Sequence, residues 1–368
     1  MLKSMERLAK SLPPRPCLCH RPKLPTHRIS LSRSLNTSSS SSSSTSSSSS
    51  SIINDLRSRA PKSISDYLTP MRSHLLTTTI SDLVLHGLPP SPSPSPSPSP
   101  SSPTIQTPGR ILPQGHHLVY FPIQTAPSKL GPDGADPDHS PGAEYPRRMW
   151  AGGEVIFRRG WDEKLVLDGR PWSCREEIGH VEVRGAEPDD KVFVDVWRRY
   201  GAGHEGEGGE PRAWDIEERR TLVFMRRRRR RRRRSAQCSE EGGAAPRRAA
   251  IKVPREPSYS CSVTPSPIHL FHFSALTFNA HFIHLDRVYA RSTDGHRDLL
   301  VHGPLTLALM LDALRGRVAR ITYRNYAPLY VNDEMTVCVR EAEAGPWDVW
   351  VEGPGGGLAV RGAAVMER

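Results

Sequence analysis

One segment limits the possible folds of this chain more than any other: LLVHGPLTLALMLDALRGR, near the C-terminal end. Gly303 and Pro304 are typical of a helix start, because proline fits the first helical position without losing a hydrogen bond. From Leu305 to Leu314 the predicted helix is apolar almost all round. Such a helix has no polar face for water, so it requires protein on every side. The chain must therefore supply a layer that surrounds it.

That layer is predicted in the residues that follow the helix. Four strand-like runs, separated by turns rich in Gly, Pro, Asn and Asp, read VARITYRNYAPLY, EMTVCVREAE, PWDVWVEG and LAVRGAAVME. One buried helix wrapped by an antiparallel sheet is an α+β architecture, the shape known as a hot dog. We expect this unit to occupy residues 258–368.

A second unit of the same class is predicted upstream, over residues 52–224. Strand-forming segments dominate residues 110–224, including HHLVYFPI, KVFVDVWRRY and RRTLVFM. Residues 52–86 carry apolar residues at mixed helical spacings, and Pro61 and Pro70 should divide them into short helices. The expected fold is thus α+β, a double hot dog of two tandem units, each a helix wrapped by an antiparallel sheet.

The N-terminal 51 residues differ in composition from the rest and predict a targeting segment. Residues 1–36 hold eight basic residues and one acidic residue, and MLKSMERLAKSL alternates apolar and basic positions at helical spacing. This pattern is typical of a mitochondrial presequence, so we expect the mature protein in the mitochondrial matrix; a disordered basic tail is the alternative. The serine run at 38–51 predicts a disordered linker, and the Ser-Pro repeat within 88–109 predicts an extended spacer.

The formal net charge of +12 is concentrated in two places. Residues 1–36 contribute +7 and nine consecutive arginines at 226–234 contribute +9, which leaves −4 for the rest of the chain. Such a run can bind a phosphate backbone, so a nucleic-acid binder is one alternative. No aromatic residues interleave the run, and loop-closure cost grows slowly with loop length. We therefore favour an inert linker over 225–257 and expect no specific nucleic acid as a partner.

Cysteine spacing and hydropathy argue against two further classes of protein. None of the six cysteines forms a CxxC pair, which fits a reducing compartment and no structural zinc. No uninterrupted apolar run approaches the ~18–20 residues that a membrane helix requires. We expect neither a bound metal nor a membrane span.

The segment LTFNAHFIHLDRVYA, residues 276–290, gathers side chains that can do chemistry. His284 is the best candidate base, because the ordinary pKa of histidine, ~6.5, lies near working pH. Asn279 cannot relay a proton, but it can position water or simply cap the loop. His281, His284 and Asp286 offer three possible metal ligands, and no fourth ligand is evident. A catalytic loop, a metal site and an ordinary loop all remain open on these residues alone.

FSALTFNAHFIHLDRVYA followed by LLVHGPLTLA resembles the MaoC-like hydratase and dehydratase family. In that family the loop reads Gly-Asp, then Asn-Pro, then His, then an Asp two positions further on. Asn279 stands at the first aspartate position, Phe282 at the proline and His284 at the histidine, so the five-residue spacing is kept. Upstream, PRRMWAGGEVIF, DKVFVDVWRR and EERRTLVFM are similar to two-domain members, the fungal mitochondrial hydroxyacyl-thioester dehydratase type 2 and mesaconyl-CoA hydratase-like branch.

The resemblance implies roles for individual residues. Hydration of an enoyl thioester requires a base for the water, a proton for the α-carbon and a donor to the carbonyl oxygen. His284 would be the base, and Asn279 would position the water. The backbone N–H of Gly303, at the start of the buried helix, would stabilise the oxyanion. The residues expected to line the substrate site are His281, Asp286 and His302.

Together these observations predict a hydro-lyase, a 3-hydroxyacyl-thioester dehydratase or enoyl-thioester hydratase of mitochondrial fatty-acid synthesis that needs no cofactor. Its substrate would be carried on acyl carrier protein or on coenzyme A, and the sequence does not decide between them. A mesaconyl-CoA-type hydratase and a non-catalytic acyl-thioester-binding paralogue are the alternatives. A homodimer is one expectation for the oligomeric state, which the sequence does not decide either.

Overall fold

The computed structural model describes residues 44–84, 110–122, 124–204, 213–226 and 256–367. The predicted presequence, the Ser-Pro repeat and residues 227–234 of the arginine run lie outside the described residues. No helix of the described part is long and apolar enough to cross a membrane.

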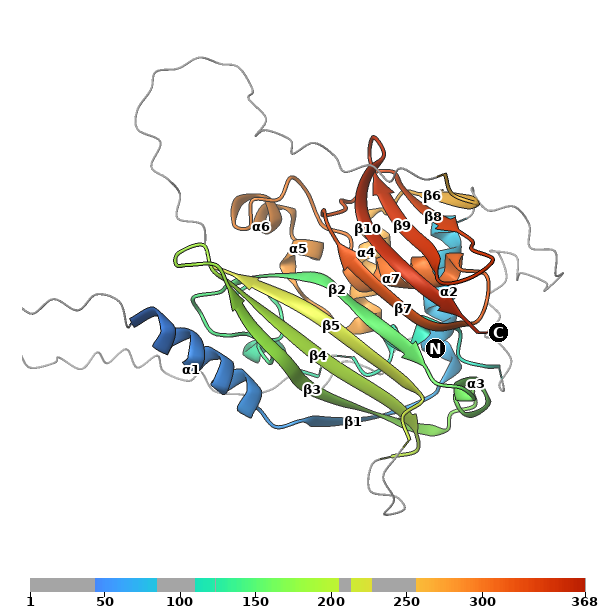
Figure 1. The fold of residues 1–368 in the computed structure, drawn as a ribbon, viewed down its shortest axis with the longest axis horizontal. Helices are drawn as coiled ribbons and strands as arrows, with labels where there is room; N and C mark the ends of the chain where they lie inside the picture. Colours follow the sequence, from blue (N-terminus) through green and yellow to red (C-terminus); the bar gives the residue numbers. More distant parts are fainter. Residues whose placement is uncertain (1–43, 85–109, 123, 205–212, 227–255, 368) are drawn as a thin grey trace, which may run out of the picture. The chain divides into compact units, whose positions relative to one another are not determined.

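A single ten-stranded sheet runs through residues 62–366 (Figure 1). In pairing order its strands are β1 (Lys62–Tyr67), β3 (Pro171–Arg184), β4 (Lys191–Ala202), β5 (Ile216–Met225), β2 (Arg147–Phe157), β7 (Val318–Asn325), β10 (Gly357–Met366), β9 (Trp347–Gly353), β8 (Met335–Arg340) and β6 (Tyr259–Val263). Every pairing is antiparallel. The first five strands belong to the N-terminal half and the last five to the C-terminal half. The predicted α+β double hot dog is therefore confirmed.

The two halves join where β2 pairs with β7. Strand β2 carries a bulge between Trp150 and Gly152 in its pairing with β5. Gly152 has φ +150°, and a side chain there would collide with the carbonyl oxygen of Tyr323. Trp150 Nε1 donates to Tyr323 Oη at 2.9 Å, and Asn325 Nδ2 donates to the Trp150 carbonyl at 2.7 Å. The glycines of RRMWAGGEVIF thus allow the strands of the two halves to approach closely.

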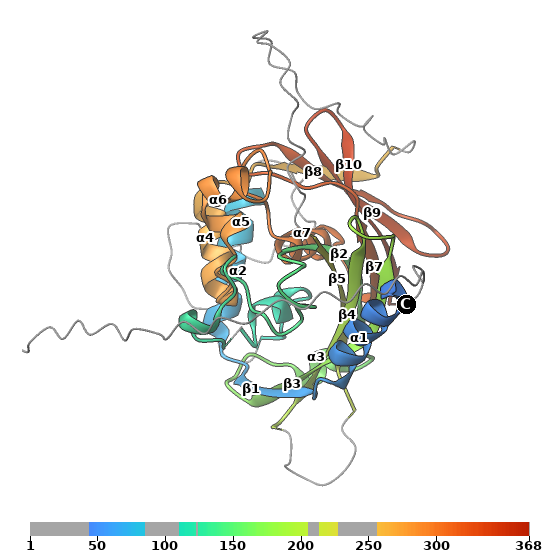
Figure 2. The same ribbon diagram turned by 90° about the vertical axis from the view of Figure 1, so that its left-hand side faces the viewer.

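The buried helix predicted from the sequence is α7 (Gly303–Ala313), with Pro304 in its first turn. Almost all its side chains are buried, as an all-round apolar helix requires. In Figure 2 the helix lies between the sheet of the C-terminal half and a layer that contains α2 (Pro70–Val84) and α4 (Pro267–Thr277), which pack on each other. Each buried leucine contributes about 1.5–3 kcal/mol of hydrophobic stabilisation. This burial places the first turn of α7 deep in the structure.

The N-terminal half differs from the predicted unit in one respect: none of its described helices is wrapped by its strands as α7 is by the strands of the C-terminal half. The concave side of its strands is covered by residues 110–122, an irregular segment with one 3-10 turn, η1 (His116–Val119). Tyr120 and Phe121 pack on Trp172, with ring centroids 5.0 and 4.4 Å apart. The strand predicted for HHLVYFPI is therefore wrong. The side chains of residues 116–121 are all buried, whereas a strand on one face of a sheet would alternate between buried and exposed side chains.

The segment before the Ser-Pro repeat differs in part from the predicted short helices. Its elements are α1 (Ser44–Ser58), strand β1 and α2. Pro70 begins a helix as predicted, but Pro61 precedes a strand that pairs with β3 at the sheet edge. Helix α1 begins inside the serine run that predicts a disordered linker. The remaining helices are α3 (Trp161–Lys164), η2 (Pro127–Lys129), α5 (Phe282–Leu285) and α6 (Arg287–Ser292).

The first residue of the arginine run, Arg226, belongs to the folded structure, although the sequence predicted an inert linker there. Strand β5 extends to Met225, and the next residue, Arg226, forms ion pairs with Glu144, Glu187 and Asp190 at 2.5, 2.7 and 2.6 Å. Its guanidinium also lies over the Tyr145 ring. A linker here therefore starts no earlier than residue 227.

Candidate active site

The loop that carries the candidate chemistry follows α4. Ser266 caps this helix through a capping box, and Pro267 occupies its first turn. The helix ends where Phe278 adopts a left-handed conformation with φ 52°, and Asn279 N donates back to the Ser274 carbonyl at 2.9 Å. This tight exit turns the chain directly into the short helices α5 and α6.

His284 lies on α5 and is buried. Its Nδ1 lies 2.8 Å from the carbonyl oxygen of Leu300. Because a carbonyl can only accept, Nδ1 carries the proton and Nε2 keeps its lone pair. Burial lowers the pKa of His284 to about 4. The side chain is therefore a neutral imidazole near neutral pH, with one nitrogen able to take a proton.

His302 stacks on His284, with ring centroids 3.7 Å apart and planes inclined by 20°. Its Nε2 lies 2.9 Å from the Ser274 hydroxyl, and its Nδ1 is buried without a partner among the described residues. Burial, together with the nearby His284 and His281, lowers its pKa well below the ordinary value. Two stacked neutral imidazoles thus form one wall of the site, and His302 holds the plane of the His284 ring.

His281 connects the loop to the N-terminal half. Its ring meets that of His284 edge-on at 5.7 Å, and its Nε2 lies 3.5 Å from Asp133 Oδ2. Asp133 is also 3.6 Å from Arg148 Nε, and its carbonyl accepts from Phe282 N at 2.8 Å. A side chain at Gly134, which has φ +75°, would collide with the loop backbone. The sequence analysis did not identify Asp133 or Arg148 as site residues.

Asn279 and Gly303, the other two proposed catalytic residues, both line the same cavity as His284. The Asn279 Oδ1 accepts from His281 N at 3.1 Å, so the side chain caps the loop and leaves its amide NH₂ for other partners. Gly303 is the first residue of α7, whose first-turn amides have no acceptor within the helix. A Cβ at this position would lie 3.1 Å from Trp150 Cγ. Glycine therefore makes room for Trp150 as well as exposing its backbone.

Asp286 lies apart from these residues. It is exposed, and its Oδ1 accepts from the backbone amides of Val288 and Tyr289 at 2.8 and 2.9 Å, so it caps α6. It does not line the cavity, and its predicted place in the substrate site is wrong. The turn from α5 into α6 carries it away from His281 and His284. No three His, Cys, Asp or Glu side chains of the described residues gather as metal ligands.

The site opens into a cavity of about 1170 Å³ that both halves of the chain line. His281, His284, His302 and Gly303 form its wall in the C-terminal half. Trp150 and Arg148 belong to the wall of the N-terminal half, which continues to side chains of β3, β4 and β5. The cavity is large enough for an extended ligand whose reacting end lies at the histidines.

Comparisons with known proteins show which family the chain resembles in sequence. Residues 115–331 match the sequence profile of the family described as hydroxyacyl-thioester dehydratase type 2. The mesaconyl-C4-CoA hydratase of Chloroflexus aurantiacus is 30% identical over 237 residues, 62% of this chain and 74% of that protein. The mitochondrial hydroxyacyl-thioester dehydratase type 2 of Schizosaccharomyces pombe is 25% identical over 274 residues, 66% of this chain and 80% of that protein.

Solved structures match the same fold. The MaoC-like dehydratase of Phytophthora capsici superposes with a TM-score of 0.54 at 12% identity, over 86% of this chain and 99% of that chain. HtdX of Mycobacterium tuberculosis superposes with a TM-score of 0.51 at 11% identity, over 84% of this chain and all of that chain. At such identities the likeness concerns the fold alone.

Proposed function

This chain belongs to the hydroxyacyl-thioester dehydratase type 2 family, and we propose that it interconverts 3-hydroxyacyl and trans-2-enoyl thioesters by removing or adding water. The observation that supports this most is the state of His284. It is a neutral imidazole with its Nδ1 proton engaged by Leu300, its ring stacked on His302 and its position at the cavity wall. A base that is unprotonated at working pH is what the attack of water on an enoyl group requires.

In the hydration direction, Nε2 of His284 takes a proton from water as the water oxygen bonds to the β-carbon. The electrons of the double bond move toward the thioester carbonyl, whose oxygen becomes negative. The imidazolium then returns a proton to the α-carbon, so that one water has been added and the base is restored. Dehydration is the reverse of these steps. One histidine serves for both proton transfers because Asn279 cannot carry a proton.

Asn279 and Gly303 would stabilise this reaction without exchanging protons. The amide of Asn279, fixed by its bond to His281 N, would orient the attacking water. The backbone N–H of Gly303 would donate to the enolate oxygen at the start of α7, where the helix dipole favours negative charge. His302 and His281 would shape the site around the base. Asp286 has no part in this scheme.

The carrier of the acyl group would be acyl carrier protein or coenzyme A, and the compartment would be the mitochondrial matrix. Two relatives with the dehydratase name are described as mitochondrial, which supports the organelle. The basic amphipathic leader, residues 1–36, supports import. Mass spectrometry of the endogenous protein should find a mature terminus beyond this leader, and an intact Met1 on a cytosolic protein would contradict the assignment.

A spectrophotometric assay tests the activity. Loss of the enoyl-thioester absorbance should be followed with crotonyl-CoA and with the corresponding carrier-protein thioester. We expect turnover with at least one carrier. Binding without turnover of either would identify a non-catalytic acyl-thioester-binding protein instead.

A further inference from the structure

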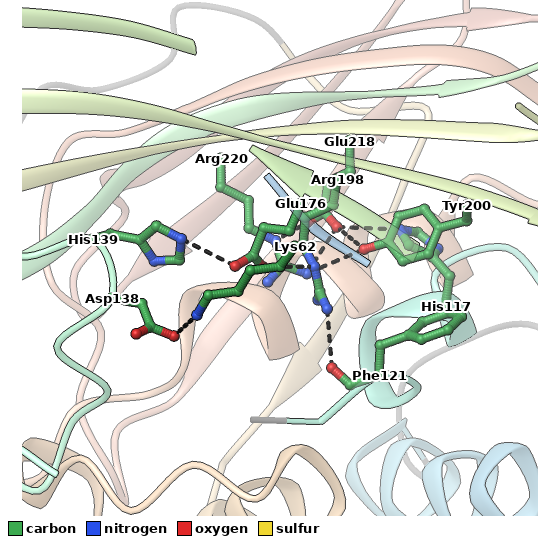
Figure 3. Close-up of polar contacts among 10 residues, drawn as sticks. All are labelled: Lys62, His117, Phe121, Asp138, His139, Glu176, Arg198, Tyr200, Glu218 and Arg220. Carbon is green, nitrogen blue, oxygen red and sulfur yellow. Dashed lines mark hydrogen bonds and ion pairs between the residues drawn. The ribbon is translucent and has the colours of Figure 1, made fainter. Parts of the chain in front are cut away.

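A row of charged side chains at the N-terminal wall of the cavity is held together by internal ion pairs (Figure 3). Glu176 of β3 pairs in register with Arg198 of β4, which pairs in register with Glu218 of β5. Arg198 Nε lies 3.1 Å from Glu176 Oε2, and its Nη2 donates to the Phe121 carbonyl at 2.9 Å. Arg220 donates to Glu218 through Nε and Nη2, at 2.7 and 2.8 Å. Each arginine of this row therefore gives two of its three nitrogens to the protein itself.

Arg148 of β2, on the same wall, is far less engaged. Its side chain lines the cavity and is only 16% exposed, and its ion pair is long, with Nε 3.6 Å from Asp133 Oδ2. Its guanidinium lies over the Phe224 ring, 5.4 Å from the ring centre, which supports it on one side. Nη1 and Nη2 have no hydrogen-bond partner among the described residues, and neither is among the polar atoms sealed from solvent there. Both nitrogens are therefore available to a ligand in the cavity.

Arg148 lies beside the catalytic loop, along a part of the wall that opens to solvent. Asp133 Oδ2, which faces Arg148, is also 3.5 Å from His281 Nε2. The exposed residues Gln124 and Lys129, in the loop that leads to Asp133, line the same cavity. A thioester whose reacting end lies at the histidines can therefore reach solvent along this loop by passing Arg148.

The charges around Arg148 favour a neutral hydrogen-bond acceptor as its ligand. Burial lowers the pKa of Arg148, but Asp133, Asp136 and Tyr289 favour its charged form, so it remains a cation. Because two carboxylates already balance this cation, an anionic ligand would add negative charge without a counter-charge. Methylene groups would displace the water that solvates Nη1 and Nη2 and return no hydrogen bond. A carbonyl oxygen accepts from a guanidinium and leaves the charge balance unchanged.

We propose that Arg148 donates a hydrogen bond to an amide carbonyl of the pantetheine arm, which links the acyl group to its carrier. This rests on the proposed function. That function gives the thioester carbonyl to the backbone N–H of Gly303, and the oxygen at the β-carbon to His284 and Asn279. The amide carbonyls are the next neutral acceptors along the substrate. Because coenzyme A and acyl carrier protein both present pantetheine, Arg148 recognises the part that the two carriers share.

A series of truncated carriers tests this contact. The crotonyl thioesters of coenzyme A, phosphopantetheine, pantetheine, N-acetylcysteamine and 2-mercaptoethanol lose in turn the nucleotide, the phosphate, the outer amide and the inner amide. For the parent enzyme, kcat/KM should fall at least about tenfold at the step that removes the bound amide, because a hydrogen bond to a charged group is lost. Arg148→Met should abolish most of that fall, chiefly by raising KM for the thioesters that carry the amide.

A second variant and a control separate binding from folding. Arg148→Lys keeps the charge beside Asp133 and removes the planar fork, so it should fold like the parent and reduce the same fall in kcat/KM. Arg158→Met is the matched control, because Arg158 follows the same strand, is more than half exposed and pairs with Glu217 outside the cavity. Its profile over the five thioesters should match that of the parent.

Three results would overturn the assignment while leaving the proposed function standing. An equal loss on all five thioesters in the Arg148 variants would mean that this residue serves the thioester or the fold. A loss confined to the two phosphorylated carriers would assign Arg148 to a phosphate. An unchanged profile in both variants would exclude it from binding the arm. A parent enzyme that turns over none of the thioesters would instead reject the proposed function, and this contact with it.

Discussion

The two halves of the sheet have the same number of strands, but their strands enclose different elements and present different side chains to the cavity. The C-terminal half encloses the apolar helix α7 and presents three neutral histidines at the cavity. The N-terminal half encloses an irregular segment, and its own strands present paired ions to the cavity. One architecture thus serves two chemistries, because the element that covers the concave face decides which side chains reach the ligand.

The difference also separates what each half contributes to the proposed enzyme. A backbone N–H at a helix start can stabilise a developing negative charge, and a buried neutral imidazole can accept a proton. The guanidinium and carboxylate groups of the N-terminal half are paired with one another, so Arg198, Glu218 and Arg220 stay charged near neutral pH. Burial opposes the charge of Arg198, but the neighbouring Cys174, Tyr200, Glu176 and Glu218 raise its pKa well above the usual range. The proposed reaction therefore belongs to the C-terminal half of the cavity.

Removing the proposed base of the C-terminal half should have the largest effect on activity. His284→Ala should lower turnover of the enoyl thioester by ~100–10,000-fold, the usual contribution of a general acid–base group. His180→Ala, an exposed histidine on β3 of the N-terminal half, is the control and should retain parental activity. Steady-state kinetics measure both. A His284→Ala enzyme as fast as the parent would place the base elsewhere in the cavity.

Removing a buried carboxylate of the N-terminal half should lower the stability of the fold. Glu218→Gln leaves Arg220 buried without its counter-charge and should cost about 3 kcal/mol of unfolding free energy, measured by denaturant titration. Glu217→Gln, on the opposite face of β5, is the control; its partly exposed pairs with Arg158 and Arg199 should matter by less than about 1 kcal/mol. Equal effects of the two substitutions would contradict the importance of burial.

The same glutamate predicts how the stability depends on pH. Although burial opposes ionisation, Arg220 and its neighbours lower the pKa of Glu218 to about 2, from its ordinary value of 4.5. The ionised form is therefore favoured by folding, so this contribution is complete above pH ~4.5 and is lost as the pH falls toward 2. In Glu218→Gln the stability should decline less over this window. An identical acid decline in the variant and the parent would show that other carboxylates dominate.

Asn279 should matter less than His284. Asn279→Ala should lower kcat on the order of tenfold, because the oriented water is lost while proton transfer survives. Asn279→Asp should fold and stay active, since a carboxylate also accepts from His281 N. Asn279→Ser can keep the loop cap but loses the amide donor, so it separates capping from water positioning. If the serine variant matches the parent, Asn279 serves only as a cap.

The smallest effect is expected from the arginine run. Deleting residues 227–234 while keeping Arg226 should change thioester turnover by no more than a few-fold, because the deletion leaves in place the ion pairs of Arg226 with Glu144, Glu187 and Asp190 at the end of β5. A matched Arg226→Gln variant should lower the melting temperature more than the deletion does. A large loss of turnover with a carrier-protein substrate alone would instead assign the run to docking of that acidic partner.

Elements with a local signal could be predicted from the amino-acid sequence. Helix α7 follows from its Gly-Pro start and all-round apolar composition, and strands β7 to β10 follow from turn residues between strand-forming runs. The candidate loop could also be predicted, since the spacing from Asn279 to His284 is a property of one short segment. The strand prediction for HHLVYFPI failed because β-forming residues are also suited to a buried irregular segment. The packing of the surrounding strands decides between the two conformations.

Which distant residues meet depends on how the strands pair and how the two halves pack. Asp133 reaches His281 across the interface of the two halves, and the row from Glu176 to Glu218 exists because three strands pair in one register. A shift of one residue in any strand would turn its charged side chain to the opposite face. Register and docking depend on contacts between segments far apart in the chain, which a reading of local pattern does not contain. The position of Asp286 could not be predicted for the same reason: it caps α6 instead of lying in the expected substrate site.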